Sequence, residues 1–186
     1  MSAGNRVSPF EVVLEESELG ETTREFFSES WQEARDGLLA QTQLVRVVPD
    51  PGPCPMRFRF EFDLPYKRKA GVGAPVELVA GPLRGSILYR PDLMALDPAD
   101  REATIAVFLD QDQQFFHPNF SRAFGMLCIG DIPPEPFPLQ ALLEHLYGIF
   151  TYQNRTPGDP ADFEAARYFA TDPESMAGLE IVEPLY

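Results

Sequence analysis

The sequence predicts an α+β fold, in which one amphipathic helix precedes a run of β-strands and further helices follow. Apolar residues recur at helical spacing after position 21, alternate with polar residues between positions 56 and 64, and return to helical spacing after position 139. A chain of 186 residues with 44% hydrophobic content is long enough to bury one core. We therefore expect one domain over residues 21–186, preceded by an acidic N-terminal extension over residues 1–20.

The first predicted helix begins at Glu21. Its apolar face consists of Phe27, Trp31, Ala34 and Leu38, which follow one another at spacings of four, three and four residues. Thr22 and Glu25 have the spacing of a capping box, in which a hydroxyl and a carboxylate accept from free backbone N–H groups at the helix start. This pattern predicts a helix that packs its aromatic side chains into the core.

Four strand regions are predicted after this helix, over residues 41–48, 56–64, 76–89 and 104–109. In the second region, apolar residues alternate with charged ones, as in a strand with one buried face. The third region is interrupted at Gly81 and Pro82, because proline cannot donate to a strand ladder. The order of elements is therefore a helix followed by strands.

Two helices are predicted near the C-terminal end, after a stiff loop formed by Pro133, Pro134, Pro136 and Pro138. Leucines and other apolar residues recur at helical spacing over residues 139–152. Asp159 and Pro160 have the residue types of an N-cap and a first helical position, so we expect the last helix to begin there.

Composition limits the possible functions. The net charge of −14 opposes binding to nucleic acid and favours a basic protein surface as partner. Neither Cys54 nor Cys128 has a Cys or His neighbour at metal-ligand spacing, so the sequence predicts no metal site and no disulfide framework. No apolar run reaches membrane-spanning length. We expect a cytoplasmic protein that does not bind a membrane.

The segment from His117 to Cys128 carries most of the chemistry that the sequence offers. Taken alone, Cys128 is most simply a buried small apolar residue, and Asn119 a turn residue. A dyad of Cys128 with His117 or His145 is a further interpretation, although His145 fits a solvated position on its helix.

Around these residues the chain resembles the ubiquitin-conjugating enzymes, over about residues 115–172. The family has a His-Pro-Asn turn followed by Gly-x-x-Cys, and here stand His117-Pro118-Asn119 and Gly125-Met126-Leu127-Cys128. A proline-rich loop, an apolar helix, a polar Pro/Asp segment and a short helix with Glu164-Ala165-Ala166 follow in the family's order.

The resemblance implies a fold with an N-terminal helix, a four-stranded antiparallel meander and C-terminal helices. It implies that Cys128 accepts a ubiquitin-like protein as a thioester from an activating enzyme and passes it to the amine of a protein target. Asn119 would stabilise the oxyanion, and Asp159 would orient or deprotonate the amine. His117 and Pro118 would be structural, with His117 forming a hydrogen bond that locks the turn. No metal and no organic cofactor is implied.

The chain also departs from the family pattern. The Trp-Ser-Pro after the cysteine and the Tyr-Pro-Phe-x-Pro-Pro before the turn are absent, and the first helix is acidic overall. These departures indicate a divergent, bacterial member, similar to those encoded in operons of which several act in phage defence. Two alternatives stay open: a catalytically silent module that binds ubiquitin-like proteins, and a cysteine hydrolase that would place a histidine within hydrogen-bond reach of Cys128.

Overall fold

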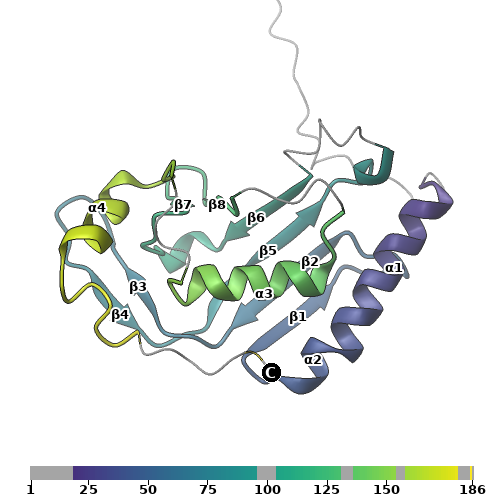
Figure 1. The fold of residues 1–186 in the computed structure, drawn as a ribbon, viewed down its shortest axis with the longest axis horizontal. Helices are drawn as coiled ribbons and strands as arrows, with labels where there is room; N and C mark the ends of the chain where they lie inside the picture. The colour runs from purple at the N-terminus through teal and green to yellow at the C-terminus, as the bar shows by residue number, and fades with distance from the viewer. Residues whose placement is uncertain (1–18, 96–103, 131–135, 154–157, 180–184, 186) are drawn as a thin grey trace, which may run out of the picture.

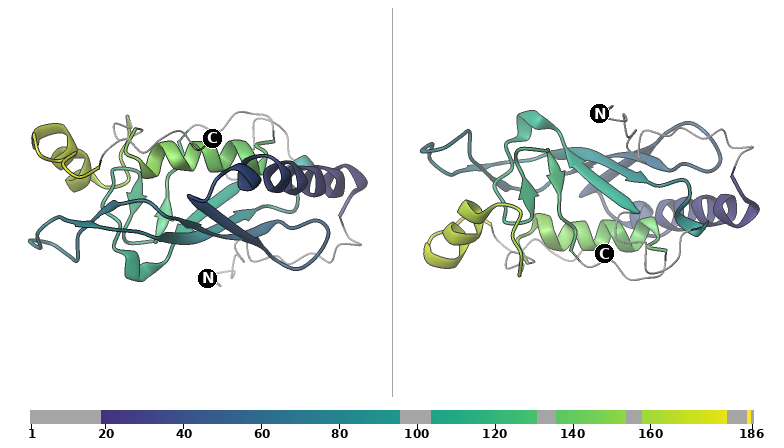
Figure 2. Two further views of the ribbon diagram at one scale, coloured as in Figure 1. Left: turned by 90° about the horizontal axis from the view of Figure 1, so that it is seen from below. Right: turned by 90° about the horizontal axis from the view of Figure 1, so that it is seen from above.

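A computed structural model describes residues 19–95, 104–130, 136–153, 158–179 and 185 of the chain. Most of the predicted N-terminal extension lies outside these residues, as does much of the proline-rich loop. The fold is α+β, with a six-stranded antiparallel sheet and a separate two-stranded sheet. Helices α1 and α3 lie on the same side of the larger sheet (Figures 1 and 2).

Helix α1, Glu21–Asp36, begins at the predicted residue, but the predicted capping box is wrong. The N-cap is Gly20, no side chain caps the helix, and Thr22 lies inside its first turn. Gly37 then separates α1 from the short helix α2, Leu38–Gln41, so that Leu38 continues the apolar face from a second element.

The six-stranded sheet has the order β1-β2-β5-β6-β8-β7, and all its neighbouring strands are antiparallel. Its strands are β1 (Val45–Pro49), β2 (Arg57–Phe62), β5 (Leu83–Tyr89), β6 (Ile105–Leu109), β7 (Phe120–Ser121) and β8 (Met126–Leu127). Each of the four predicted regions overlaps one of the first four strands of this sheet, in the same order. The break at Gly81-Pro82 is also present, because β4 on its N-terminal side belongs to the other sheet.

Several short features were not predicted from the sequence. Strand β3 (Tyr66–Arg68) pairs with β4 (Glu77–Val79) to form the second sheet, and β7 and β8 form a hairpin. Of these strands, only β4 falls within a predicted region, 76–89. Two 3₁₀ turns, η2 (Leu93–Ala95) and η4 (Gln111–Gln113), lie on either side of β6 in the chain. Strands and turns of two or three residues are too short to produce a recognisable hydrophobic period.

The core lies between the sheet and α3, Leu139–Phe150, which covers most of the predicted helix 139–152. Phe58, Phe60 and Phe62 of β2 point inward, as the alternating pattern predicts. The ring of Phe150 packs edge to face against Phe62, with the centroids 5.1 Å apart. Such contacts stabilise the fold beyond the burial of aromatic area, and they fix α3 on the sheet.

Tyr152 connects the end of α3 to the segment before His117. Its hydroxyl accepts a hydrogen bond from the Lys67 backbone N–H (2.8 Å) and donates one to the Phe116 carbonyl (3.2 Å). The side chain is fully buried, and its backbone φ of 60° is in the left-handed region. A buried polar pair of this kind is costly to break, so it fixes the start of the His-Pro-Asn turn.

The last described helix is α4, Phe163–Thr171, which lies at the same end of the molecule as β7 and β3 (Figure 1). Its bounds differ from the prediction, because it begins three residues after Pro160. Within the described ranges, no helix has both the length and the apolar character needed to span a membrane.

Candidate active site

Cys128 and Asn119 face each other at the base of the β7–β8 hairpin. Asn119 directly precedes β7 and Cys128 directly follows β8. The Cys128 N–H donates to the Asn119 carbonyl at 2.6 Å, and the Asn119 Nδ2 donates to the Cys128 carbonyl at 3.0 Å. The structure therefore brings the thiol-bearing residue and the amide next to each other.

The interpretation of Cys128 as a buried apolar residue is wrong, because its side chain is exposed. Its neighbours Leu127 and Ile129 are both buried. In extended chain, successive side chains point to opposite sides, so burial of these two neighbours turns the thiol toward solvent. Cys128 thus carries an accessible thiol on a backbone that its neighbours anchor.

His117 is fully buried and locks the turn before Asn119. Its Nδ1 accepts a hydrogen bond from the Asn119 backbone N–H at 3.0 Å, in agreement with the expected role. Its ring stacks on Phe115 at an interplanar angle of 3°. Burial lowers the pKa of His117 to about 3, against the opposing effect of the Ile149 carbonyl, so the imidazole is neutral near pH 7.

The side-chain amide of Asn119 is held in one orientation. Its Nδ2 faces the carbonyl oxygen of Cys128, where only a donor fits. Its Oδ1 is buried and has no hydrogen-bond partner among the described residues. An unsatisfied buried acceptor costs about 1–3 kcal/mol, and such costs cluster at functional sites.

Asp159 is not the N-cap that the sequence predicts. The cap of α4 is Asp162, whose Oδ1 accepts from the N–H groups of Glu164 and Ala165, both at 3.0 Å. Both aspartates have the residue type for a cap, and the position of Pro160 suggested the wrong one. Asp159 is exposed, three residues before the actual cap. Its carboxylate is therefore not occupied in capping the helix.

A network of ion pairs joins α4 to the hairpin and to the segment after β3. Arg122 Nε contacts Asp162 Oδ2 at 2.7 Å, and Arg122 Nη2 contacts Glu164 Oε2 at 2.9 Å. Lys69 pairs with the other oxygen of Glu164. The Asp162 N–H also donates to the Pro118 carbonyl at 3.0 Å. Sequence reasoning missed this network, because its members are distant in the chain.

His145 is half-buried and hydrogen-bonded, rather than fully solvated as the sequence suggested. Its Nε2 lies 2.7 Å from the carbonyl oxygen of Ile129, the residue after Cys128. Both histidines of the chain lie in the described part, and neither forms a hydrogen bond with the Cys128 sulfur there. The geometry therefore lacks the feature that the hydrolase interpretation requires.

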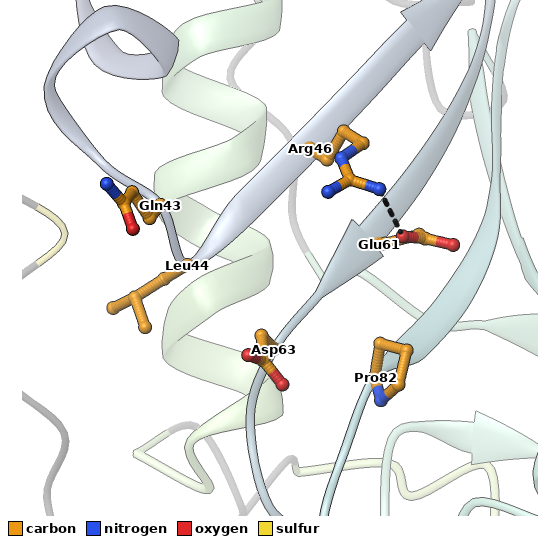
Figure 3. A pocket seen from close by; sticks show the side chains of 6 residues that line it. All are labelled: Gln43, Leu44, Arg46, Glu61, Asp63 and Pro82. Carbon is orange, nitrogen blue, oxygen red and sulfur yellow. Dashed lines mark hydrogen bonds and ion pairs between the residues drawn. The ribbon is translucent and has the colours of Figure 1, made fainter.

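Of two surface hollows formed by described residues, one adjoins these elements and one lies at a distance. A groove of about 560 Å³ lies between the turn after β3, the residues around η4 and the β7–β8 hairpin, and it is lined in part by Lys69, Arg122 and Phe120. A smaller pocket of about 200 Å³ lies near β1 and β2, at the other edge of the sheet (Figure 3). The candidate site adjoins the first of these.

The arrangement pairs an exposed thiol with an amide donor, a combination suited to acyl transfer. No group of three or more His, Cys, Asp or Glu side chains in the described ranges forms a metal-binding cluster. No protein-family model matches the chain, and no curated protein is similar to it.

The low pKa of His117 predicts a specific loss of stability in acid. Between the ordinary value of 6.5 and about 3, the unfolded chain binds a proton at this residue that the folded chain does not. Each pH unit below 6.5 therefore costs about 1.4 kcal/mol. In His117→Asn, whose amide oxygen retains an acceptor, the free energy of unfolding should fall less steeply between pH 6 and pH 4. Urea unfolding checks this, and equal slopes would contradict it.

The assignment of the helix cap predicts unequal effects for two neighbouring aspartates. Asp162→Ala removes the cap and an ion pair and should lower the free energy of unfolding by about 2 kcal/mol. Asp159→Ala, the matched control, should change it by less than about 0.5 kcal/mol because the side chain is exposed. The measurement is the urea midpoint of each variant. Equal losses would mean that Asp159 is also structural.

Proposed function

We propose that this chain is a divergent ubiquitin-like-protein conjugating enzyme that carries its cargo as a thioester on Cys128. The observation that carries the proposal is the exposed thiol of Cys128 beside the fixed amide of Asn119. A nucleophile with an adjacent N–H donor is what transfer of an acyl group through a tetrahedral intermediate requires.

The arrangement of elements supports the finer proposal that the fold is that of the ubiquitin-conjugating enzymes. Helix α1 precedes four long strands in antiparallel, consecutive order, and α3 and α4 follow the hairpin that carries Cys128. This is the order that the resemblance implies. The β3–β4 sheet between β2 and β5 would be an addition in this chain.

In the first step, the Cys128 thiolate attacks the carbonyl carbon of the thioester on the activating enzyme. A new C–S bond forms to Cys128, and the sulfur of the activating enzyme leaves as a thiolate that takes up a proton. The Asn119 Nδ2 has a second N–H beyond the one donated to the Cys128 carbonyl. That N–H would stabilise the negative oxygen of the intermediate.

In the second step, an amine of the target attacks the carbonyl carbon held on Cys128. The C–N bond forms, the C–S bond breaks, and Cys128 leaves as a thiolate while the nitrogen loses a proton. Asp159 would attract the ammonium form and accept this proton, since its exposed carboxylate is not used as a helix cap. His117 cannot serve as the base, because it is buried and already accepts a hydrogen bond.

The acidic face of α1 suggests how the activating enzyme would be recognised. Glu21, Glu25, Glu29 and Glu33 are exposed and follow one another at a spacing of four residues. Residues four apart lie on the same face of a helix, so these carboxylates form one stripe. We propose that α1 meets a basic surface of the activating enzyme, in keeping with the net charge of −14.

The proposed thioester predicts a specific pattern of adducts. The purified chain is incubated with ATP, an activating enzyme and its ubiquitin-like protein, taken from neighbouring genes, and run on a non-reducing gel. Wild type should form a thiol-sensitive adduct, Cys128→Ser a thiol-resistant ester and Cys128→Ala none. If no variant forms an adduct while the activating enzyme is charged, the proposal fails and a silent binding module becomes the better account.

The proposed role of Asn119 predicts a kinetic defect after loading. In Asn119→Ala, discharge of the Cys128 thioester to free lysine should slow about 100-fold, the usual effect of losing one oxyanion donor. Single-turnover discharge of precharged protein gives the rate constant. Melting temperatures of both proteins separate this effect from a loss of folding. An unchanged discharge rate would exclude the amide as an oxyanion donor.

A further inference from the structure

We propose that His145 is a positioning residue that holds the backbone at Ile129, directly after Cys128. This inference rests on the proposed function, because the effect of His145 on the reaction matters only if Cys128 is the acceptor. The contact that carries it joins the middle of α3 to the residue that follows the thiol.

The hydrogen bond has only one possible direction. His145 Nε2 lies 2.7 Å from the Ile129 carbonyl oxygen. Because a carbonyl can only accept, the Nε2 must carry the proton and donate. The residue is thus used here as a hydrogen-bond donor to the main chain.

The ring of His145 is itself held in place. Phe137 packs against it edge to face, with centroids 6.2 Å apart. The carbonyl oxygen of Phe137 accepts a hydrogen bond from the Tyr89 hydroxyl at 3.0 Å. Tyr89 is buried in the core, where it packs against Phe27 and Phe58. A chain of contacts therefore runs from the core through Phe137 and His145 to the backbone at Ile129.

Cys128 lies between two fixed points. Its own N–H donates to the Asn119 carbonyl at 2.6 Å, and its own carbonyl accepts from Asn119 Nδ2 at 3.0 Å. On its C-terminal side, the Ile129 carbonyl is bound to His145, and the Ile129 side chain is buried. Gly130, which follows, has a φ of 74° in the left-handed region. Without His145, the Ile129 carbonyl loses its hydrogen bond, and the position of Cys128 relative to Asn119 depends on the two Asn119 hydrogen bonds and the burial of Ile129 alone.

The reaction depends strongly on such placement. A displacement of about 1 Å between reacting groups can cost about 100-fold in rate. Loss of the His145 contact should therefore lower the maximal rate of thioester formation by about 10-fold or more. The KM for the charged activating enzyme should not change, because His145 does not belong to the surface that would meet it.

A matched set of variants separates this role from general stability. In His145→Gln the amide nitrogen takes the place of Nε2 and can still donate to Ile129. In His145→Asn the amide has the same chemistry, but the shorter side chain cannot reach the Ile129 carbonyl. In His145→Leu the donor is absent. Gln140→Leu is the control, because it exchanges a polar residue for leucine on the same helix, away from Ile129.

The experiment measures two quantities on each protein: steady-state thioester formation on Cys128, and amide hydrogen exchange of the segment around Ile129. We expect His145→Asn and His145→Leu to lose rate at constant KM and to exchange faster there. His145→Gln and Gln140→Leu should match wild type in both. Equal rates and equal exchange in all variants would overturn the positioning role.

Failure of the underlying function has a different signature. If wild type forms no thioester with a charged activating enzyme, the proposed function is wrong, whereas the exchange data still decide whether His145 holds the segment. If His145→Gln is as defective as His145→Leu, the hydrogen bond is not the cause, and the positioning proposal is overturned.

Discussion

The hydrogen bond between the Cys128 N–H and the Asn119 carbonyl closes the β7–β8 hairpin, and the remaining features of the candidate site depend on that closure. Strands of two residues cannot hold a hairpin together in water, so the closure needs support from outside. The support comes from β6, which pairs with β8, and from the burial of Phe120 and Leu127. The exposed thiol is thus carried by a hairpin that the core holds in place.

Two polar groups around this hairpin hold the backbone in place but lower the stability of the fold. His117 is buried as a neutral imidazole, and the Asn119 Oδ1 has no partner in the described part of the chain. Both arrangements cost free energy, since buried polar atoms normally keep their hydrogen bonds. The aromatic packing of Phe115 and Tyr152 around His117 offsets part of this cost. Sites that bind or react with ligands commonly accept such a loss.

Sequence reasoning succeeded where the signal was local and repeated. The spacing of leucines predicted α3, and the alternation in 56–64 predicted β2, because both patterns extend over several turns or residues. It failed for the cap of α4, since Asp159 and Asp162 have identical local chemistry. It also failed for His145, whose partner lies 16 residues away and is fixed only by the packing of α3. At the site, the sequence suggested the proximity of Asn119 and Cys128 only through a resemblance.

The ion pairs between the hairpin and α4 affect the charge of the site as well as its shape. Arg122 and Lys69 are both paired, with Asp162 and Glu164, so these four side chains carry no net charge together. In the described ranges, Asp159 forms no ion pair, and its carboxylate is exposed to solvent. An exposed carboxylate attracts an ammonium group by about 1 kcal/mol at 4 Å in water, and by more where solvent is partly excluded. The network therefore fixes α4 against the His-Pro-Asn turn, and within it the positive charges of Arg122 and Lys69 are matched by the carboxylates of Asp162 and Glu164.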